Sequence, residues 1–148
     1  MKTTAITYII LMLMIMSSCF SSKKNTENKS KNGSVEQMAK DIVYDRAFVW
    51  DEQFAGYKIL SASLSDSTLT ISFTYKGKSA DDDFNLIFNG MFAKSLPAKA
   101  TLYLKQETSG DNDFEKTMQF NISKARYNKG EKTIILLHSF EGQFDLMH

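Results

Sequence analysis

Apolar and polar residues alternate one by one through most of the chain from residue 57 onward. In residues 69–76, Leu, Ile, Phe and Tyr occupy every second position, and Thr, Ser and Lys lie between them. The same period of two recurs in residues 84–89, 100–105 and 118–123. Because successive side chains of a β-strand point to opposite faces, this period predicts half-buried strands rather than helices. The pattern restricts the chain to an all-β fold.

Further segments complete the predicted set of strands. Residues 57–64 are joined to the strand at 69–75 by the turn Ser65-Asp66-Ser67, which predicts a hairpin. Residues 134–137 form a continuous apolar run, typical of a strand covered on both faces, and residues 144–146 are expected to form an edge strand. Six or seven short strands without alternating helices predict an antiparallel β-sandwich, immunoglobulin-like or similar. Connections of unequal length favour the sandwich over a closed barrel.

Two segments before these strands carry weaker signals. Ser34 and Gln37 match a capping box, and the apolar residues that follow share one helical face, which predicts a short helix over residues 34–43. Residues 47–50 are an apolar run that we expect to form a first strand or a packed segment. Within it lies the only tryptophan, Trp50. We expect this side chain to anchor the core or its rim rather than to serve as a platform for a ligand.

The chain begins with the pattern of an export signal that ends in a cysteine. A basic residue precedes an apolar run at 5–16, and Ser17-Ser18 place small side chains directly before Cys19. The run is shorter than the ~20 residues that span a bilayer. The arrangement resembles a bacterial lipoprotein signal, although Met16 stands where leucine or another aliphatic residue is usual. The resemblance implies that the Cys19 thiol is lipidated, that the signal is then cut off, and that Cys19 becomes the first residue of the mature protein. The alternative is an ordinary secretory signal followed by an unpaired thiol.

These signals divide the chain into three parts. Residues 1–18 are predicted to be the signal peptide, residues 19–33 a polar, lysine-rich tether, and residues 34–148 the β domain. The tether is best interpreted as a solvated spacer, although its lysines also suit anionic head groups. Lys23 and Lys24 stand where surface-exported lipoproteins of Bacteroidetes often carry acidic residues. We therefore expect an envelope location, at the outer membrane and facing the periplasm.

Charge and cysteine content exclude several classes of function. Cys19 is the only cysteine, so its lipidation leaves the domain without a disulfide or a thiolate metal site. Residues 41–148 carry twelve basic and fifteen acidic residues, a balance of −3. Nothing in this balance predicts a nucleic-acid partner. His138 and His148 have no second histidine or cysteine at ligand spacing, so a zinc site is not expected.

Acidic residues gather in two predicted loops. Asp81-Asp82-Asp83 lies between two strands, and hard carboxylate oxygens suit calcium, which takes six to eight oxygen ligands. A second loop with Asp111, Asp113 and Glu115 could lie at the same end of a sandwich. The stretch after Asp111 lacks the glycine and glutamate that a helix-loop-helix calcium site requires. A solvated loop is the simpler interpretation, and calcium binding is kept as an alternative.

The sequence contains no arrangement that requires catalysis. No serine lies in a Gly-x-Ser-x-Gly elbow, and no histidine can be assigned to one as a base. A carboxylate pair for hydrolysis remains an alternative, but the acidic residues gather in turns rather than on strand faces that would line a cleft. We therefore expect a non-enzymatic module, held at the membrane by its lipid anchor, that binds an envelope protein, a glycan or another envelope component.

Residues 69–122 resemble a group of small uncharacterised lipoproteins of Bacteroidetes. The most specific part is Gly90-Met91-Phe92-Ala93-Lys94-Ser95-Leu96-Pro97, which matches the pattern Gly-x-Phe-x-Lys-Ser-Leu-Pro. Ser79 and Asp82 stand where those proteins have cysteine and histidine, and Phe114 stands where they have a second cysteine. The resemblance therefore implies that any disulfide or thiol–imidazole site of these proteins is lost here. It implies no activity.

Overall fold

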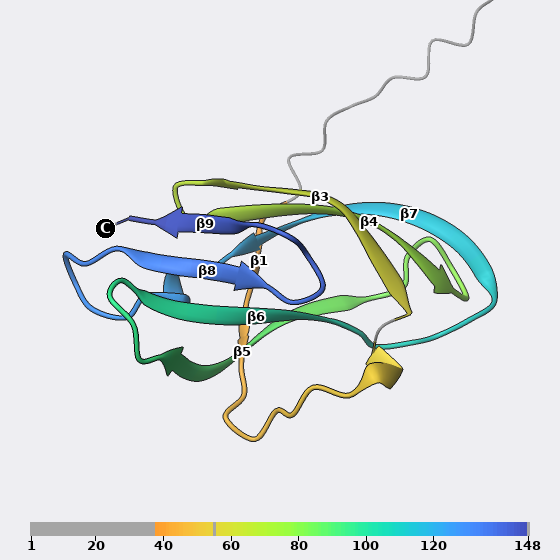
Figure 1. Ribbon diagram of the computed structural model, residues 1–148. Coiled ribbons are helices and arrows are strands. Elements are labelled where there is room, and N and C mark those ends of the chain that lie inside the picture. The colour runs from red at the N-terminus through yellow and green to blue at the C-terminus, as the bar shows by residue number, and fades with distance from the viewer. Residues whose placement is uncertain (1–37, 55, 148) are drawn as a thin grey trace, which may run out of the picture. The chain divides into compact units, whose positions relative to one another are not determined.

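Two mixed β-sheets pack face to face in the computed structural model, which describes residues 38–54 and 56–147 (Figure 1). One sheet has the strand order β1-β7-β4-β3 and the other has the order β2-β5-β6-β8-β9. The strands are Lys40–Asp41 (β1), Val43–Tyr44 (β2), Tyr57–Ser65 (β3), Thr68–Gly77 (β4), Phe84–Ala93 (β5), Ala98–Gln106 (β6), Asn112–Asn121 (β7), Thr133–Leu137 (β8) and Gln143–Leu146 (β9). Short 3-10 turns occupy Glu52–Phe54 (η1) and Ser123–Ala125 (η2). The predicted all-β sandwich is confirmed.

The period of two in the sequence produces the core between the sheets. Leu69, Ile71 and Phe73 on β4 are fully buried, as are Phe84 and Leu86 on β5. Phe73 and Phe84 meet across the sandwich with their ring centroids 4.6 Å apart in an edge-to-face contact. All buried members of this core lie between Ile42 and Leu146.

The predicted hairpin and edge strand are both present. β3 pairs with β4 in antiparallel register up to Ser65 and Thr68, so the turn consists of Asp66 and Ser67. Asp66 has a φ of 53°, in the left-handed region that aspartate tolerates better than most residues. β9 lies at the edge of the five-stranded sheet, beside β8.

The sheets are mixed rather than purely antiparallel. β6 and β8 pair in parallel, because β7 between them in sequence lies in the opposite sheet. When the chain re-enters the five-stranded sheet as β8, it runs in the same direction as β6. β1–β7 and β2–β5 are also parallel pairs. The turn chemistry that predicts hairpins says nothing about such crossings between sheets.

The predicted helix at residues 34–43 is wrong in its described part. From residue 38 the chain is extended, and it passes from one sheet to the other as β1 and then β2. Ile42, between these strands, is only 3% exposed, and its N–H donates to the carbonyl of Asn121 at 3.4 Å. Met38 is 91% exposed, so the apolar residues do not form a helical face. Pairing with two sheets overrides a weak capping signal, whose Ser34 and Gln37 lie outside the described residues.

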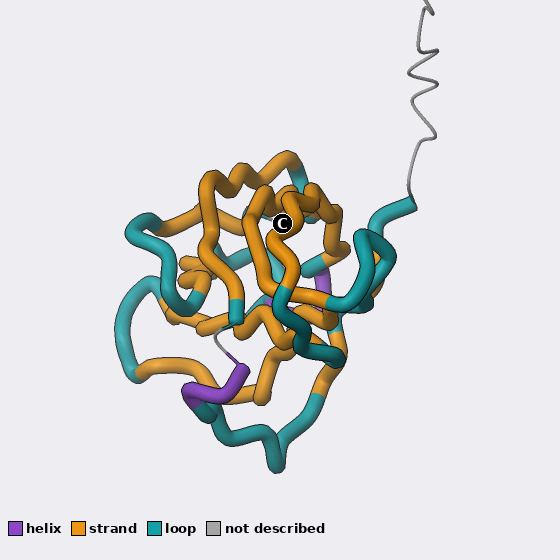
Figure 2. Tube along the Cα trace, turned by 90° about the vertical axis from the view of Figure 1, so that its right-hand side faces the viewer, coloured by secondary structure: helices purple, strands orange, loops and turns teal. Residues whose placement is uncertain are grey.

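Residues 45–54, which we call the strap, cross the outer face of the five-stranded sheet (Figures 1 and 2). This segment is not a strand, so the predicted packed segment is the correct alternative. Phe48 and Trp50 pack against Tyr103, with ring centroids 5.4 and 5.8 Å away. Ile87 is the cross-strand neighbour of Tyr103 and also faces outward, yet it is only 4% exposed. The strap therefore forms a second, smaller apolar cluster outside the sandwich.

Candidate binding surfaces

The three consecutive aspartates follow β4 and are partly engaged in local contacts. Asp83 forms an ion pair with Lys40, at 2.8 Å between Oδ1 and Nζ. The hydrogen bond from Lys40 lowers the pKa of the Asp83 carboxyl. Asp82 Oδ2 accepts a hydrogen bond from the backbone N–H of Lys78 at 2.8 Å, while Asp81 is exposed. Two of the three carboxylates thus stabilise the loop and its contact with β1.

The second acidic segment is mostly strand. Asp113 and Glu115 lie within β7, and only Asp111 precedes it. Asp113 Oδ1 lies 3.8 Å from Nζ of Lys76 on β4. Among the described residues, no three carboxylate, imidazole or thiol side chains come together as a group that could hold a metal ion. Calcium binding stays a prediction, with no assembled ligand set to support it.

His138 lies beneath the strap, where its ring packs against Trp50 with the centroids 4.3 Å apart. Burial lowers the pKa of this imidazole. Nδ1 lies 2.9 Å from Oγ of Ser139, a residue with a φ of 64°. Trp50 is thus a rim anchor, as predicted, but of the outer cluster rather than of the core between the sheets. The serine and histidine are chain neighbours, and the histidine ring packs against the rings of Trp50 and Tyr103.

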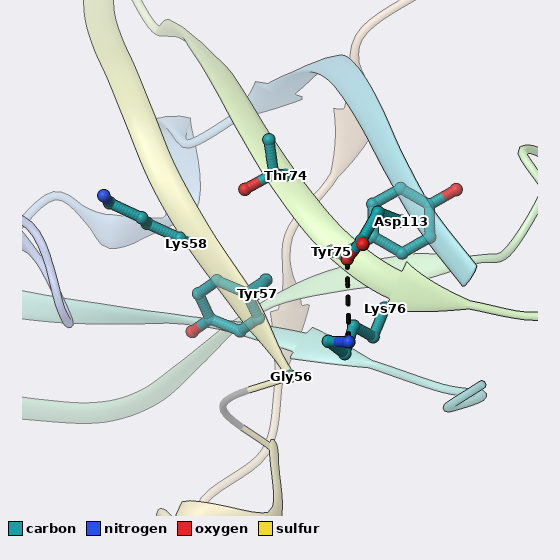
Figure 3. Close-up of a pocket in the computed structure, with 7 residues that line it drawn as sticks. All are labelled: Gly56, Tyr57, Lys58, Thr74, Tyr75, Lys76 and Asp113. Atoms are coloured by element: carbon teal, nitrogen blue, oxygen red, sulfur yellow. Dashed lines mark ion pairs between the residues drawn. The ribbon is translucent and has the colours of Figure 1, made fainter. Parts of the chain in front are cut away.

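A shallow groove lies where β3 begins beside the end of β4 (Figure 3). Its volume is about 300 Å³, at the lower end of the range for small-molecule sites. Two tyrosines, two lysines, a threonine, a glycine and an aspartate line it: Gly56, Tyr57, Lys58, Thr74, Tyr75, Lys76 and Asp113. Burial raises the pKa of Tyr57, whose buried hydroxyl has no hydrogen-bond partner among the described residues. The lining offers cations and a hydroxyl, which suit binding of a small acidic group.

The Gly-x-Phe-x-Lys-Ser-Leu-Pro segment forms the end of β5 and the turn into β6. Gly90 has a φ of 77°, and a Cβ there would collide with the ring of Tyr44. Phe92 packs against Phe88 and Tyr127, with centroids 5.2 and 5.0 Å away. The Oγ of Ser95 donates to the carbonyl of Pro97 at 2.8 Å. The motif therefore encodes a bend and a turn that expose its apolar tip.

The loops at the two ends of the sandwich differ in charge. Each strand from β3 to β9 reverses the direction of the one before it, so successive loops alternate between the ends. Residues 66–67, 94–97 and 122–132 lie at one end and carry five basic and two acidic residues. Residues 51–56, 78–83, 107–111 and 138–142 lie at the other and carry one basic and eight acidic residues. We call these the basic end and the acidic end.

The predicted lipidation residue Cys19, the signal and the tether lie outside the described residues. Within residues 38–54 and 56–147, no helix is long and apolar enough to cross a membrane. The sequence-predicted sites therefore divide into residues that the structure places, such as Asp81–Asp83 and His138, and an anchor that it does not describe. Sequence reasoning missed the groove, which depends on how the strands pair, and it also missed the difference in charge between the two ends.

Comparisons with known proteins give a likeness of fold. No family model matches the chain, and no curated protein matches it. A protein of unknown function from Bacteroides vulgatus is 17% identical, with a TM-score of 0.47, over 74% of this chain and 56% of that one. A NigD-like immunity protein from Bacteroides caccae is 11% identical, with a TM-score of 0.45, over 67% of this chain and 51% of that one. The chain spans little more than half the length of either, and likenesses this distant carry no argument about function.

Proposed function

We propose that this chain is a non-enzymatic binding module of the cell envelope, held at the outer membrane by lipid on Cys19 and facing the periplasm. The observation that carries the proposal is the Ser17-Ser18-Cys19 sequence directly after an apolar run, the pattern of an export signal that ends in a cysteine. Residues 38–54 and 56–147 supply the binding module, with a buried core between Ile42 and Leu146. The pattern of Ser17-Ser18-Cys19 after an apolar run supplies the anchor in this proposal.

The surface of the domain suits binding better than chemistry. The groove of Figure 3 is lined by Lys58, Lys76 and Thr74, which can hold a ligand by charge and hydrogen bonds. The ion pair of Lys76 with Asp113 is largely exposed, so an acidic group from a partner can compete for this ammonium at little cost. Binding at such a groove requires no titratable group with a strongly shifted pKa.

The anchor is tested by expressing the full chain and its Cys19→Ala variant in a bacterial host that processes lipoproteins. The unaltered chain should partition with membranes, and its intact mass should equal that of residues 19–148 plus acyl chains. Cys19→Ala should appear in the soluble periplasmic fraction without acyl mass, because the thiol that carries the lipid is gone.

A matched control keeps this result specific. Ser18→Ala retains a small residue before the cysteine, so it should be processed and acylated like the unaltered chain. Equal membrane partition of Cys19→Ala and the unaltered chain, or a mature mass without acyl groups on the unaltered chain, would contradict the proposed anchor.

A further inference from the structure

The basic end carries exposed apolar side chains at the tip of a turn. Leu96, in the turn between β5 and β6, is 96% exposed, and Met91 near the end of β5 is 67% exposed. Tyr127, which packs on Phe92, is 49% exposed. Single exposed apolar residues are common, but Met91 and Leu96 are two large ones only five positions apart at the same end of a small domain. Because the turn that holds Leu96 lies at the end of the sandwich, this side chain is not buried between the two sheets.

Lysines without ion-pair partners surround this tip. Lys94, Lys99 and Lys129 form no ion pair with any described residue. The register places them together, because Ala93 pairs with Lys99 and Ala98 pairs with Thr133, at the end of the loop that holds Lys129. Two other cations of this end are neutralised, Lys124 by Asp41 and Lys132 by Asp145, whereas the buried Nε of Arg126 has no hydrogen-bond partner among the described residues. The lysines that can contact a partner, Lys94, Lys99 and Lys129, therefore lie at the same end as the exposed Leu96.

We propose that the basic end of the sandwich docks on an anionic lipid surface, with Leu96 and Met91 entering the head-group region and Lys94, Lys99 and Lys129 contacting phosphates. Lysines beside protruding apolar residues are the combination that holds proteins in a membrane interface. Each lysine near an anionic surface contributes about 1 kcal/mol. The inference rests on the proposed function, since a lipid anchor keeps the domain near a bilayer.

The acidic end supports the same orientation. An anionic surface attracts the end that carries Lys94 and Lys129 and repels the end that carries Asp81–Asp83, so the domain turns its acidic loops away from the membrane. From Cys19 to Met38 the chain extends by at most about 3.5 Å per residue, or roughly 65 Å. The anchor therefore permits the basic end to reach the bilayer.

The test uses residues 20–148, which contain the core of the described residues, from Ile42 to Leu146, and lack the signal. Co-sedimentation is measured with vesicles of phosphatidylcholine alone and of phosphatidylcholine mixed with phosphatidylglycerol. We expect binding only to the anionic vesicles, and weaker binding as salt is raised, because salt screens exposed charges. The variant K94E/K99E/K129E should weaken binding by about a hundredfold, since three favourable contacts become repulsive.

Matched variants separate this surface from overall charge. K78E/K105E/K116E changes net charge equally but lies toward the acidic end and outside the groove of Figure 3, so it should retain most of the binding. M91S/L96S should weaken binding, whereas V49S/L60S, which removes two other exposed apolar side chains, should not. Circular dichroism checks that all four variants fold.

Equal binding to both kinds of vesicle, no binding to either, or equal losses in K94E/K99E/K129E and its control would overturn the proposal. Binding of polyglutamate without binding of anionic vesicles would also overturn it, and would assign the surface to an acidic protein. The acyl mass on Cys19 is measured on the full chain and is independent of these results. If the full chain carries acyl groups on Cys19 but residues 20–148 do not bind anionic vesicles, the proposed anchor stands and the proposed docking surface is wrong.

Discussion

The outer faces of the two sheets are built differently. On the four-stranded sheet, Ser61, Ser72 and Thr117 stand side by side across three strands, and the last two hydroxyls lie 2.7 Å apart. On the five-stranded sheet, Ile87 and Tyr103 occupy neighbouring outward positions beneath the strap. Small polar side chains line the outer face of the four-stranded sheet, whereas the strap covers part of the outer face of the five-stranded sheet. The same alternation therefore yields a two-layered fold on one side and a locally three-layered fold on the other.

The largest test of this difference is the outward residue Ile87. Ile87→Ala should lower the free energy of unfolding by about 3 kcal/mol, because it leaves a cavity beneath the strap. The matched change Thr70→Ala, at an outward position of the four-stranded sheet, should cost less than about 0.5 kcal/mol. Urea denaturation of both variants measures the two costs. Similar values would show that the faces do not differ as described.

The strap itself is tested at Trp50. Trp50→Ala should destabilise the domain by about 2 kcal/mol, less than a fully buried tryptophan, because the ring is only half buried and packs on one side against Tyr103 and His138. Trp50→Phe should recover roughly half of the loss by restoring an aromatic contact. Thermal and urea melts followed by far-ultraviolet circular dichroism measure both variants. An unchanged stability of Trp50→Ala would mean that the strap contributes no packing energy.

A pair of tyrosines extends the comparison to hydroxyl groups. Tyr57 and Tyr75 are cross-strand neighbours. The Tyr75 hydroxyl donates to the carbonyl of Ser79 at 2.9 Å, whereas the buried Tyr57 hydroxyl has no partner among residues 38–54 and 56–147. Tyr57→Phe should therefore raise the free energy of unfolding by about 1 kcal/mol, and Tyr75→Phe should lower it by a similar amount. Urea titrations decide the signs, and a loss in both variants would indicate that the Tyr57 hydroxyl is paired in solution.

The smallest effect is the pH dependence beneath the strap. Burial lowers the pKa of His138 from its usual 6.5, so the unfolded chain takes up the proton first as the pH falls. Stability should be fully present above about pH 6.5 and decrease on acidification below it. His138→Gln should reduce this dependence, measured as the difference in midpoint between pH 7.5 and pH 5.5. His148 is the remaining histidine, and His148→Gln serves as the control.

The sequence predicted the sandwich because its alternation is a local property. Leu69, Ile71 and Phe73 are buried at the positions that the period requires. The helix predicted over residues 34–43 is wrong from residue 38 onward, because the signal was equally local but pairing with Phe120 and Ile87, far along the chain, decided the outcome. Parallel pairing of β6 with β8 has the same origin.

The charge difference between the two ends could be predicted from the sequence. Once strands are assigned, reversing each one places alternate loops together, and the basic run at 122–132 then joins Lys94 while Glu107 and Asp111 join the aspartates. The groove could not be predicted, because it depends on where β3 begins beside β4 and on the pairing of β4 with β7, which brings Asp113 next to Lys76. The Trp50 cluster could be anticipated only as a packed segment, since no periodicity relates Trp50 to Tyr103 or His138.

The passage of residues 40–44 from one sheet to the other has a mechanical consequence. On an anchored chain, any pull between the membrane and a bound partner enters the domain through this stretch, which pairs in parallel with both β7 and β5. Tension along residues 40–44 shears β1 against β7 and β2 against β5. The backbone hydrogen bonds of these pairs therefore resist the force together instead of breaking one after another. The domain is thus fastened by both of its layers at the point where force arrives.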